Sequence, residues 1–201
     1  MDKIDMWEIE KGLNVGVICG VDEAGRGPLA GPVCAAAVIL PQGEIIPGLN
    51  DSKKLTDKKR RELFPIIKEK AVAYGIAFAT EAEIDEIDIL QATFLAMKRA
   101  IAQLEGKADF ALIDGNRETD FGIPCQTVVK GDSRSANIAA ASVLAKVTRD
   151  IYMEELAEKH PEYGFEIHKG YGTKAHYAAL TEHGMCDAHR RNFLRKFYGE
   201  K

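Results

Sequence analysis

The amino-acid sequence predicts an α/β protein built on a mixed β-sheet, and two patterns carry that prediction. Residues 15–21 and 33–40 are short, β-branched and alanine-rich runs separated by a turn rich in glycine and proline, which is typical of a hairpin of buried strands. Further along the chain, strand patterns alternate with helical patterns, and helical crossovers join parallel strands. We therefore expect a five-stranded sheet flanked by helices, antiparallel at its start and parallel where the crossovers occur.

The other elements follow in order along the chain. Short apolar runs predict three further strands, at residues 74–80, 110–113 and 124–129. Helical patterns cover residues 55–73, 90–104 and 135–159, and shorter ones after the stop at His160 and Pro161 cover 174–182 and 187–197. Thr56 is a suitable N-cap for the first helix, whereas Pro65 should kink or divide it. The second helix should pack one face on the sheet, because apolar residues recur at intervals of four and three: Leu90, Phe94, Met97, Ile101 and Leu104.

Composition narrows the class of protein. The 201 residues are enough for one domain with an appendage, and 46% apolar side chains exclude a disordered chain. The longest apolar run, residues 33–40, is far shorter than the roughly 18 residues of a membrane-spanning helix. The acidic N-terminus does not resemble a secretory leader, so we expect a cytoplasmic protein. The four cysteines show no C-x-x-C spacing and are expected to be reduced thiols: Cys19, Cys34, Cys125 and Cys186.

A boundary is expected near residue 160, between an α/β domain at 1–160 and a helical segment at 161–201. The net charge of the chain is −4, but residues 165–201 carry seven Lys and Arg against four Asp and Glu, a net +3. A polyanion contacts a local surface, so the basic segment keeps a nucleic-acid partner open. Charge alone is explained more simply by an ordinary solvated tail.

Acidic side chains stand where several strands end. Asp22 and Glu23 end the first strand, Asp114 ends the fourth, and Asp132 closely follows the fifth. In open α/β sheets ligands bind at the carboxyl ends of the strands, so these four carboxylates could converge on one crevice. Repulsion between them would require compensation by cations, and ligation by oxygen alone selects Mg²⁺ or Mn²⁺.

Each acid also has a local explanation. Asp114 before Gly115 could form a turn, and Asp132 ahead of a helix could be an N-cap. Adjacent strand residues point to opposite faces, so Asp22 and Glu23 can serve one site only if the strand distorts as it enters the glycine loop. Asp150 lies one helical turn after Lys146 and is expected to pair with it.

Two apparent binding motifs are set aside. Gly25-Arg26-Gly27 is followed by prolines and a strand rather than by a helix, and there is no Walker A lysine, so this loop does not fit a nucleotide fingerprint. It is better suited to bringing backbone close to a ligand. His183, Cys186 and His189 lack a fourth ligand, and we interpret their spacing as coincidence rather than as a zinc site.

Taken together, the motifs of the chain resemble those of bacterial ribonuclease HII, the type 2 ribonucleases H. The resemblance rests on an ordered set that spans nearly the whole sequence: residues 20–27 with 30–33, residues 50–55, 113–115, 129–132, 138–142 with 145–147 and 149–150, and 169–173 with His176. Asn192 departs from the family's His-Arg-x-Ser-Phe pattern, and Pro65 interrupts a helix.

This resemblance implies a ribonuclease H-like fold and an endonuclease that cuts the RNA strand of RNA–DNA hybrids, including single ribonucleotides embedded in duplex DNA. It makes Asp22, Glu23, Asp114 and Asp132 the metal-binding catalytic acids of a two-metal hydrolysis that gives 3′-hydroxyl and 5′-phosphate ends. It assigns the sensing of the ribose 2′-hydroxyl to residues Gly25, Arg26 and Gly27, and stacking on the next sugar to Tyr171.

Further expectations concern the substrate backbone and partners. We select as candidates for phosphate contacts Lys53, Lys130, Ser135 and Lys146. A monomer is expected. The aromatic tail at residues 193–198 could dock a replication clamp, but it lacks a glutamine-led docking motif, and a buried helix face explains its aromatic residues more simply. The rival classes are a magnesium-dependent phosphatase of small esters and a non-catalytic nucleic-acid-binding module.

Overall fold

A mixed five-stranded sheet forms the centre of the computed structural model, which describes residues 5–50 and 52–199. The strand order is β3-β2-β1-β4-β5, and the strands are β1 (Ile18–Ala24), β2 (Val33–Ile39), β3 (Ala73–Ala79), β4 (Phe110–Asp114) and β5 (Cys125–Val128). The first three strands are antiparallel, whereas β1, β4 and β5 run parallel. The predicted fold class, with its antiparallel start and parallel continuation, is confirmed.

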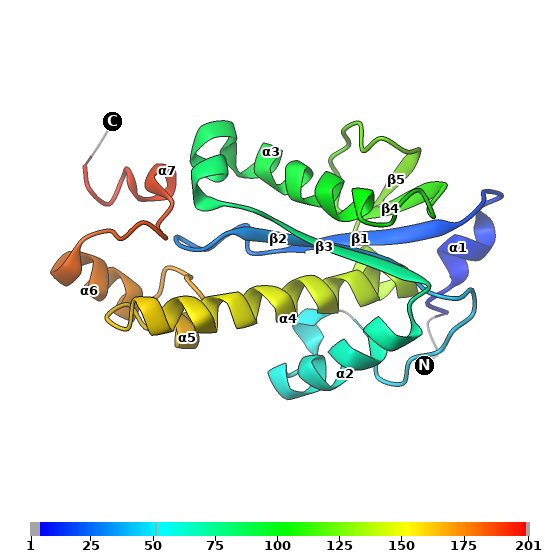
Figure 1. Cartoon of the computed structure of the whole chain (residues 1–201), viewed down its shortest axis with the longest axis horizontal. Helices are drawn as coiled ribbons and strands as arrows, with labels where there is room; N and C mark the ends of the chain where they lie inside the picture. Colours follow the sequence, from blue (N-terminus) through cyan, green and yellow to red (C-terminus); the bar gives the residue numbers. More distant parts are fainter. Residues whose placement is uncertain (1–4, 51, 200–201) are drawn as a thin grey trace.

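Helices cover both faces of this sheet. Figure 1 shows α3 (Glu81–Ala102) on one face, with α4 (Ala136–Lys159) and α2 (Asp57–Lys70) on the other. Strand β2 is buried throughout, and its residues alternate between the apolar cluster under α3 and the apolar cluster under α4 and α2. Gly20 of β1 lets α4 approach closely, because a Cβ atom at this position would lie 2.2 Å from the backbone of Asn137.

Two helices differ from the prediction in their continuity. Pro65 lies inside α2, which nevertheless runs unbroken from Asp57 to Lys70, so the expectation that it divides the helix is wrong. Leu63 and Ile67 are buried on either side of it, and their burial offsets a proline cost of about 3 kcal/mol. The interruption is instead in α3, where Asp88 has φ 68° and ψ 165°.

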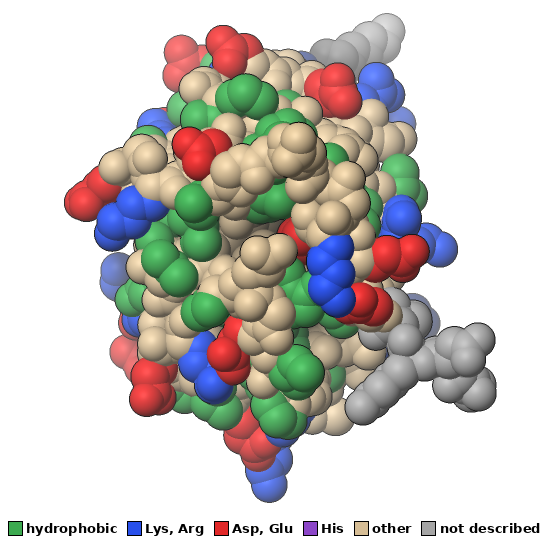
Figure 2. All heavy atoms as spheres, turned by 90° about the vertical axis from the view of Figure 1, so that its right-hand side faces the viewer, with side chains coloured by type: hydrophobic (Ala, Val, Ile, Leu, Met, Phe, Trp, Pro, Cys, Tyr) green, Lys and Arg blue, Asp and Glu red, His purple; other side chains and the backbone are tan. Residues whose placement is uncertain are grey.

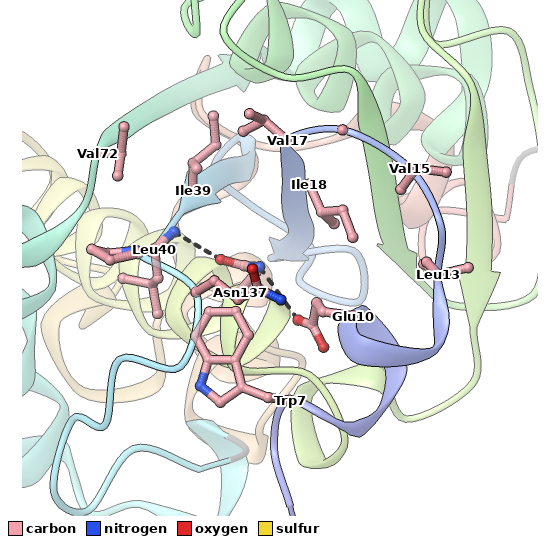
Figure 3. A pocket seen from close by; sticks show the side chains of 13 residues that line it. Trp7, Glu10, Leu13, Val15, Val17, Ile18, Ile39, Leu40, Val72 and Asn137 are labelled. Carbon is pink, nitrogen blue, oxygen red and sulfur yellow. Dashed lines mark hydrogen bonds between the residues drawn. The ribbon is translucent and has the colours of Figure 1, made fainter.

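The first strand begins later than expected. β1 starts at Ile18, and Val15 and Val17 precede it with more than 40% of their surface exposed. In front of them, a short helix that the sequence patterns did not predict, α1 (Glu8–Gly12), carries the buried Glu10. Glu10 accepts hydrogen bonds from Ser135 and Asn137, while Asn137 accepts one from the amide of Leu40, so this segment is tied to the start of α4 (Figure 3).

A cavity of about 300 Å³ lies at this end of the sheet, lined among others by Trp7, Glu10, Leu40 and Val72 (Figure 3). Figure 2 views the same end of the molecule, where acidic and basic side chains are interspersed with hydrophobic ones. A mixed surface of this kind lacks the single-sign field that attracts a polyanion. The acids at the strand ends lie at the opposite end of β1.

The C-terminal residues form short helices around the far end of α4: α5 (Phe165–His168), α6 (Lys174–His183) and α7 (Arg191–Leu194). α7 is shorter than the helix expected at 187–197. A third apolar cluster joins Leu29 and Met153 to Phe165 and Leu180, so residues on both sides of position 160 share one core. The domain boundary at 160 stays a prediction.

Three smaller features of the sequence also find their place in the fold. Asn192, where the family pattern has serine, donates its backbone amide to the carboxylate of Asp85 of α3 and its side-chain amide to the Asp85 carbonyl. All four cysteines are free thiols, as predicted. Among the described residues, no helix is long and apolar enough to cross a membrane.

Candidate active site

Three carboxylates from separate parts of the chain gather at one edge of the sheet. Asp22 lies near the end of β1, Asp114 ends β4, and Asp132 lies in a 3₁₀ turn (Gly131–Ser133) just after β5. One carboxylate oxygen from each lies within 4.8 Å of the others. They converge because β1, β4 and β5 are parallel neighbours whose carboxyl ends meet at this edge. Three of the four acids that the sequence grouped therefore lie together at this edge of the sheet.

Glu23 approaches the site from the other face of β1. The pairing of β1 with β2 continues without a bulge through Glu23 and Ala24. The backbone changes direction only at Gly25, with φ 94°. Even so, Glu23 and Asp114 line one pocket, together with Arg26 and Met97. Because the strand ends here, both of its faces are accessible from the same edge.

The local explanations of the acids are partly realised. Asp114 Oδ1 accepts the amide of Gly131 at 2.6 Å, which ties the loop after β4 to the loop after β5. The N-cap of α4 is Ser135, whose hydroxyl accepts the amide of Ile138, so Asp132 does not cap this helix. Asp132 is only 3% exposed, and Lys53 lies with its ammonium 4.0 Å from one of its oxygens.

The electrostatics of the cluster favour a cation. Burial, reinforced by the negative charges of Glu23 and Asp114, raises the pKa of Asp22 well above its ordinary value. Burial also raises the pKa of Glu23, with Arg26 opposing and Asp114 adding to the effect. A divalent cation would relieve both burial and repulsion, and the donors are all carboxylate oxygens, the ligands that Mg²⁺ and Mn²⁺ accept. The residues therefore fit the metal class that the sequence predicts.

The glycine loop and Tyr171 lie together beside the acids. The ring of Tyr171 would be 3.6 Å from a Cβ atom placed on Gly27, and 45% of its surface is exposed. Arg26 is exposed, with a guanidinium nitrogen 3.5 Å from Glu23. The loop that the resemblance links to ribose, the aromatic ring that it links to the next sugar, and the acids thus occupy adjoining positions.

The candidates for phosphate contacts divide into two kinds. Lys53 and Lys130 are exposed, and both lie beside Asp132. Ser135 is fully buried, and its hydroxyl donates to Glu10, so this candidate is withdrawn because the group is used inside the protein. Lys146 forms the predicted pair with Asp150 at 2.6 Å, and this pair satisfies the ammonium group.

The fold does not bring His183, Cys186 and His189 together as a set of three metal ligands. The thiol of Cys186 lies 3.2 Å from Nδ1 of His189, which also accepts the amide of Cys186. The ligand atoms that come within 4.8 Å of one another are those of His160, Cys186 and Asp187, and Asp187 is exposed on the surface. This group lies apart from the strand ends.

The prediction missed two fully buried arginines beneath the glycine loop. Arg149 of α4 and Arg190 before α7 are 1% and 0% exposed, and their guanidinium groups donate to backbone carbonyls of the loop. A signal for Arg149 was available, because Ala145 and Met153, four residues before and after it, lie on the buried face of α4. Arg190 stands in the segment compared with the family's His-Arg-x-Ser-Phe pattern, but that pattern does not show its partners, which are 159 to 165 residues away in the sequence.

A histidine relay behind Tyr171 was also missed. Nε2 of His176 lies 3.0 Å from Nε2 of His189, and Nδ1 of His176 lies 3.0 Å from the carbonyl oxygen of Tyr171. Because Nδ1 of His189 accepts the Cys186 amide, one neutral arrangement satisfies all three bonds: His189 donates to His176, and His176 donates to Tyr171. The relay fixes the backbone that carries the exposed ring.

Sequence comparison places this geometry among known proteins. Residues 19–199 match the Ribonuclease HII family. The ribonuclease HII of Dechloromonas aromatica is 59% identical over 179 residues, which cover 89% of this chain and 91% of that protein. The ribonuclease HII of Vibrio campbellii is 52% identical over 191 residues, or 95% of this chain and 90% of that protein.

Similar folds are found among solved structures. The ribonuclease H2 of Pyrococcus horikoshii OT3 superposes with a TM-score of 0.74 at 25% identity, covering 92% of this chain and 100% of that one. The RNase HII in a PCNA complex from Archaeoglobus fulgidus has a TM-score of 0.71 at 24% identity, covering 88% and 93%. Since relatives of more than half identity match nearly all of its length, this chain belongs to the ribonuclease HII family, whose members are metal-dependent ribonucleases H that act on RNA–DNA hybrids.

Proposed function

We propose that this chain is an endonuclease that cuts the RNA strand of hybrids and also nicks duplex DNA at single embedded ribonucleotides, by two-metal-ion catalysis. One observation carries the proposal: the carboxylates of Asp22, Asp114 and Asp132 gather at one edge of the sheet, directly beside a glycine loop and an exposed tyrosine. A site that joins a cation-binding cluster to a backbone that can approach a sugar suits hydrolysis next to a ribose.

The four acids divide the work of holding the metal. Asp22, Asp114 and Asp132 would hold it from one face of the sheet, and Glu23 would add a ligand from the other. Bound there, a pair of Mg²⁺ or Mn²⁺ ions supplies a water of lowered pKa and stabilises the charge on the leaving 3′-oxygen. No side chain is needed as a nucleophile, and the expected products are 3′-hydroxyl and 5′-phosphate ends.

The neighbouring loops would select the cleavage position. The 2′-hydroxyl is the group that tells RNA from DNA at a given site. The loop directly follows the acids of β1, and Arg26 lies 3.5 Å from Glu23, so the backbone of Gly25, Arg26 and Gly27 would contact that hydroxyl. Tyr171 presents an exposed ring on which the next sugar can stack. Lys53 and Lys130 would hold the phosphate backbone in register.

A panel of substrates tests the proposal. The protein is incubated with a duplex DNA that holds one ribonucleotide, an RNA–DNA hybrid, plain DNA and a generic phosphate ester, each with Mg²⁺, Mn²⁺ or chelator. We expect metal-dependent cutting of the first two only, with 3′-hydroxyl ends. Cleavage of plain DNA at a similar rate, or hydrolysis of the ester alone, would reject the proposal and favour the phosphatase class.

A pair of variants ties this activity to the acid cluster. Asp114→Asn keeps the oxygen that accepts the Gly131 amide but removes a ligand charge, so cleavage should fall by at least about 100-fold while the protein stays folded. Asp120→Asn is the matched control, because Asp120 is exposed outside the cluster and likewise accepts a backbone amide, that of Gly122. Near-wild-type turnover of Asp114→Asn with Mg²⁺ would show that the assignment is wrong.

Partners and cellular location remain predictions. The A. fulgidus RNase HII was solved in a complex with PCNA. In this chain Phe197 and Tyr198 are partly exposed, and the ring of Phe197 packs against Tyr177. We therefore continue to predict a monomeric, cytoplasmic protein, for which a clamp partner stays a hypothesis.

A further inference from the structure

Arg190 binds the glycine loop from beneath through three separate carbonyl groups. Its Nε donates to Gly31 at 2.8 Å, while its two terminal nitrogens donate to Arg26 at 3.0 Å and to Gly25 at 2.6 Å. Hydrogen bonds from a charged donor are stronger than neutral ones, and the fork of a guanidinium group fixes direction as well as distance. The orientation of the peptide planes after Gly25 and Arg26 is therefore set by this one side chain.

The opposite sides of those peptide planes face the substrate region. In a trans peptide the C=O and N–H groups point in opposite directions. Because the carbonyls of Gly25 and Arg26 point inward to Arg190, the amides of Arg26 and Gly27 point outward, where both residues are exposed. Bonding of the carbonyls to a cation also polarises these peptides and strengthens their N–H groups as donors. Arg190 thus directs two amide donors toward the region between the acids and Tyr171.

Arg149 joins the same loop to the segment that carries Tyr171. Its guanidinium donates to Pro32, to Ala30 and, at 3.0 Å, to the carbonyl of Lys169. The amide of Leu29 bonds to Gly170 at 2.8 Å, next to Tyr171. Gly25 has no room for a side chain, since a Cβ atom there would lie 1.9 Å from Arg149. The loop and the tyrosine are therefore held as one unit.

Burial of two charged side chains costs free energy that packing alone would not require. Two buried cations lie near each other, and burial together with the charge of Arg149 lowers the pKa of Arg190 to about 9. Both arginines attract the carboxylate of Glu81, whose buried Oε1 has no hydrogen-bond partner among the described residues. Apolar residues of similar size often stabilise a core equally well or better than buried charges. The presence of two charged side chains here is explained if their role is to orient the amides of the loop.

We propose that Arg190 is a positioning residue that determines the selectivity of this enzyme for ribose, by aiming the amides of Arg26 and Gly27, while Arg149 keeps that loop in register with Tyr171. The inference rests on the proposed function. It concerns discrimination between ribose and deoxyribose and not the chemical step.

The test compares binding of two duplexes that differ by one hydroxyl. In an Asp114→Asn background, the dissociation constant is measured in Mg²⁺ for a DNA duplex with one ribonucleotide and for the identical all-DNA duplex. Arg190→Lys keeps the charge but cannot reach three carbonyls, so the ratio of the two constants should fall about tenfold, with all-DNA binding within about twofold of the parent. Arg191→Lys, an exposed neighbour with the same change, should leave the ratio unchanged.

Each outcome bears on a different claim. If the parent protein itself does not discriminate, the proposed function fails. If the parent discriminates and Arg190→Lys discriminates equally, or weakens both duplexes by the same factor, the positioning role of Arg190 is overturned.

A second measurement covers the case in which the variant does not fold. In ¹H–¹⁵N spectra of the folded Asp114→Asn protein, the amides of Arg26 and Gly27 and the Nε–H of Arg190 should shift together on adding the ribonucleotide duplex. The all-DNA duplex should shift them much less. Equal shifts with both duplexes, or an Arg190 signal that does not respond, would overturn the inference.

Discussion

At the scale of single residues, His189 shows how burial suppresses an ionisation. Its pKa is lowered to about 4, chiefly by burial and further by the neighbouring His176, whose own pKa is lowered by burial. The ring of His189 contacts the ring of Tyr163 and the thiol of Cys186, and the charge of His160 lowers its pKa further. Both histidines of the relay behind Tyr171 must be neutral for the bonds His189 to His176 to Tyr171 to form.

This lowered pKa predicts a loss of stability in mild acid. In the unfolded chain, His189 binds a proton below its ordinary pKa of 6.5. In the folded protein it binds one only near its lowered pKa of about 4, so acid favours the unfolded state between these values. The free energy of unfolding is therefore unaffected by this group above pH 6.5. It decreases as the pH falls toward 4, by at most about 1.4 kcal/mol per pH unit for this group. Urea unfolding of the wild type at pH 7.5, 6 and 5 measures the slope, which His189→Gln should reduce.

The control for this prediction is His183→Gln, which changes a half-exposed histidine on α6 that does not belong to the relay. Its unfolding free energy should follow the wild-type pH dependence. If His189→Gln and the wild type lose the same free energy between pH 7.5 and 5, burial of His189 does not account for the acid sensitivity.

At the scale of elements, α3 is two helical pieces joined at Asp88. A residue with φ 68° and ψ 165° is in a region that is almost restricted to glycine. Its carboxylate compensates by accepting the amides of Leu90 at 2.7 Å and Gln91 at 3.0 Å, so Asp88 acts as an N-cap for the second piece. The first piece begins with a capping box formed by Thr80 and Glu83.

Substitutions at Asp88 should reverse the usual helix preference for alanine over glycine. Asp88→Ala loses the cap and keeps the backbone strain, whereas Asp88→Gly loses the cap but relieves the strain. We expect the glycine variant to be the more stable of the two by about 1 kcal/mol, as measured by urea unfolding. Ordinary helix positions favour alanine by a similar amount, so an alanine variant of higher stability would show that Asp88 is unstrained.

At the scale of the whole molecule, residues after 160 complete a core that begins before it. Tyr163, Phe165, Leu180 and Leu194 pack with Leu29 and Met153 in one apolar cluster. The same contact region holds the buried Arg190 against the glycine loop. The C-terminal segment is thus part of the structure that shapes the site, in addition to being a basic surface.

Truncation tests this dependence. A chain that ends at residue 160 exposes half of the shared cluster and leaves Arg149 without its Lys169 partner, so it should show no cooperative unfolding transition. A chain that ends at Lys196 keeps the buried Leu194 and should unfold cooperatively near the full-length midpoint. Circular dichroism during heating distinguishes these results. A cooperative, native-like transition of the shorter chain would instead support an independent domain at 1–160.

The sequence determined the order and type of most elements and the acids of the candidate site. Local periodicity is enough for this, because an apolar strand or an amphipathic helix must bury its own pattern. Parallel strands bring their carboxyl ends to one edge whatever the details of the loops, so Asp22, Asp114 and Asp132 could be grouped in advance.

Only the tertiary structure decided how individual polar groups are used. Ser135 and Lys146 looked available in the sequence, but Glu10 and Asp150 satisfy them. Pro65 was expected to break its helix, but the helix is continuous because burial of Leu63 and Ile67 offsets the cost of the proline. The sequence around Arg190 does not show its hydrogen-bond partners, because these are carbonyls 159 to 165 residues away. Hydrogen-bond partners and burial depend on which distant segments meet, and a periodic pattern contains no record of that.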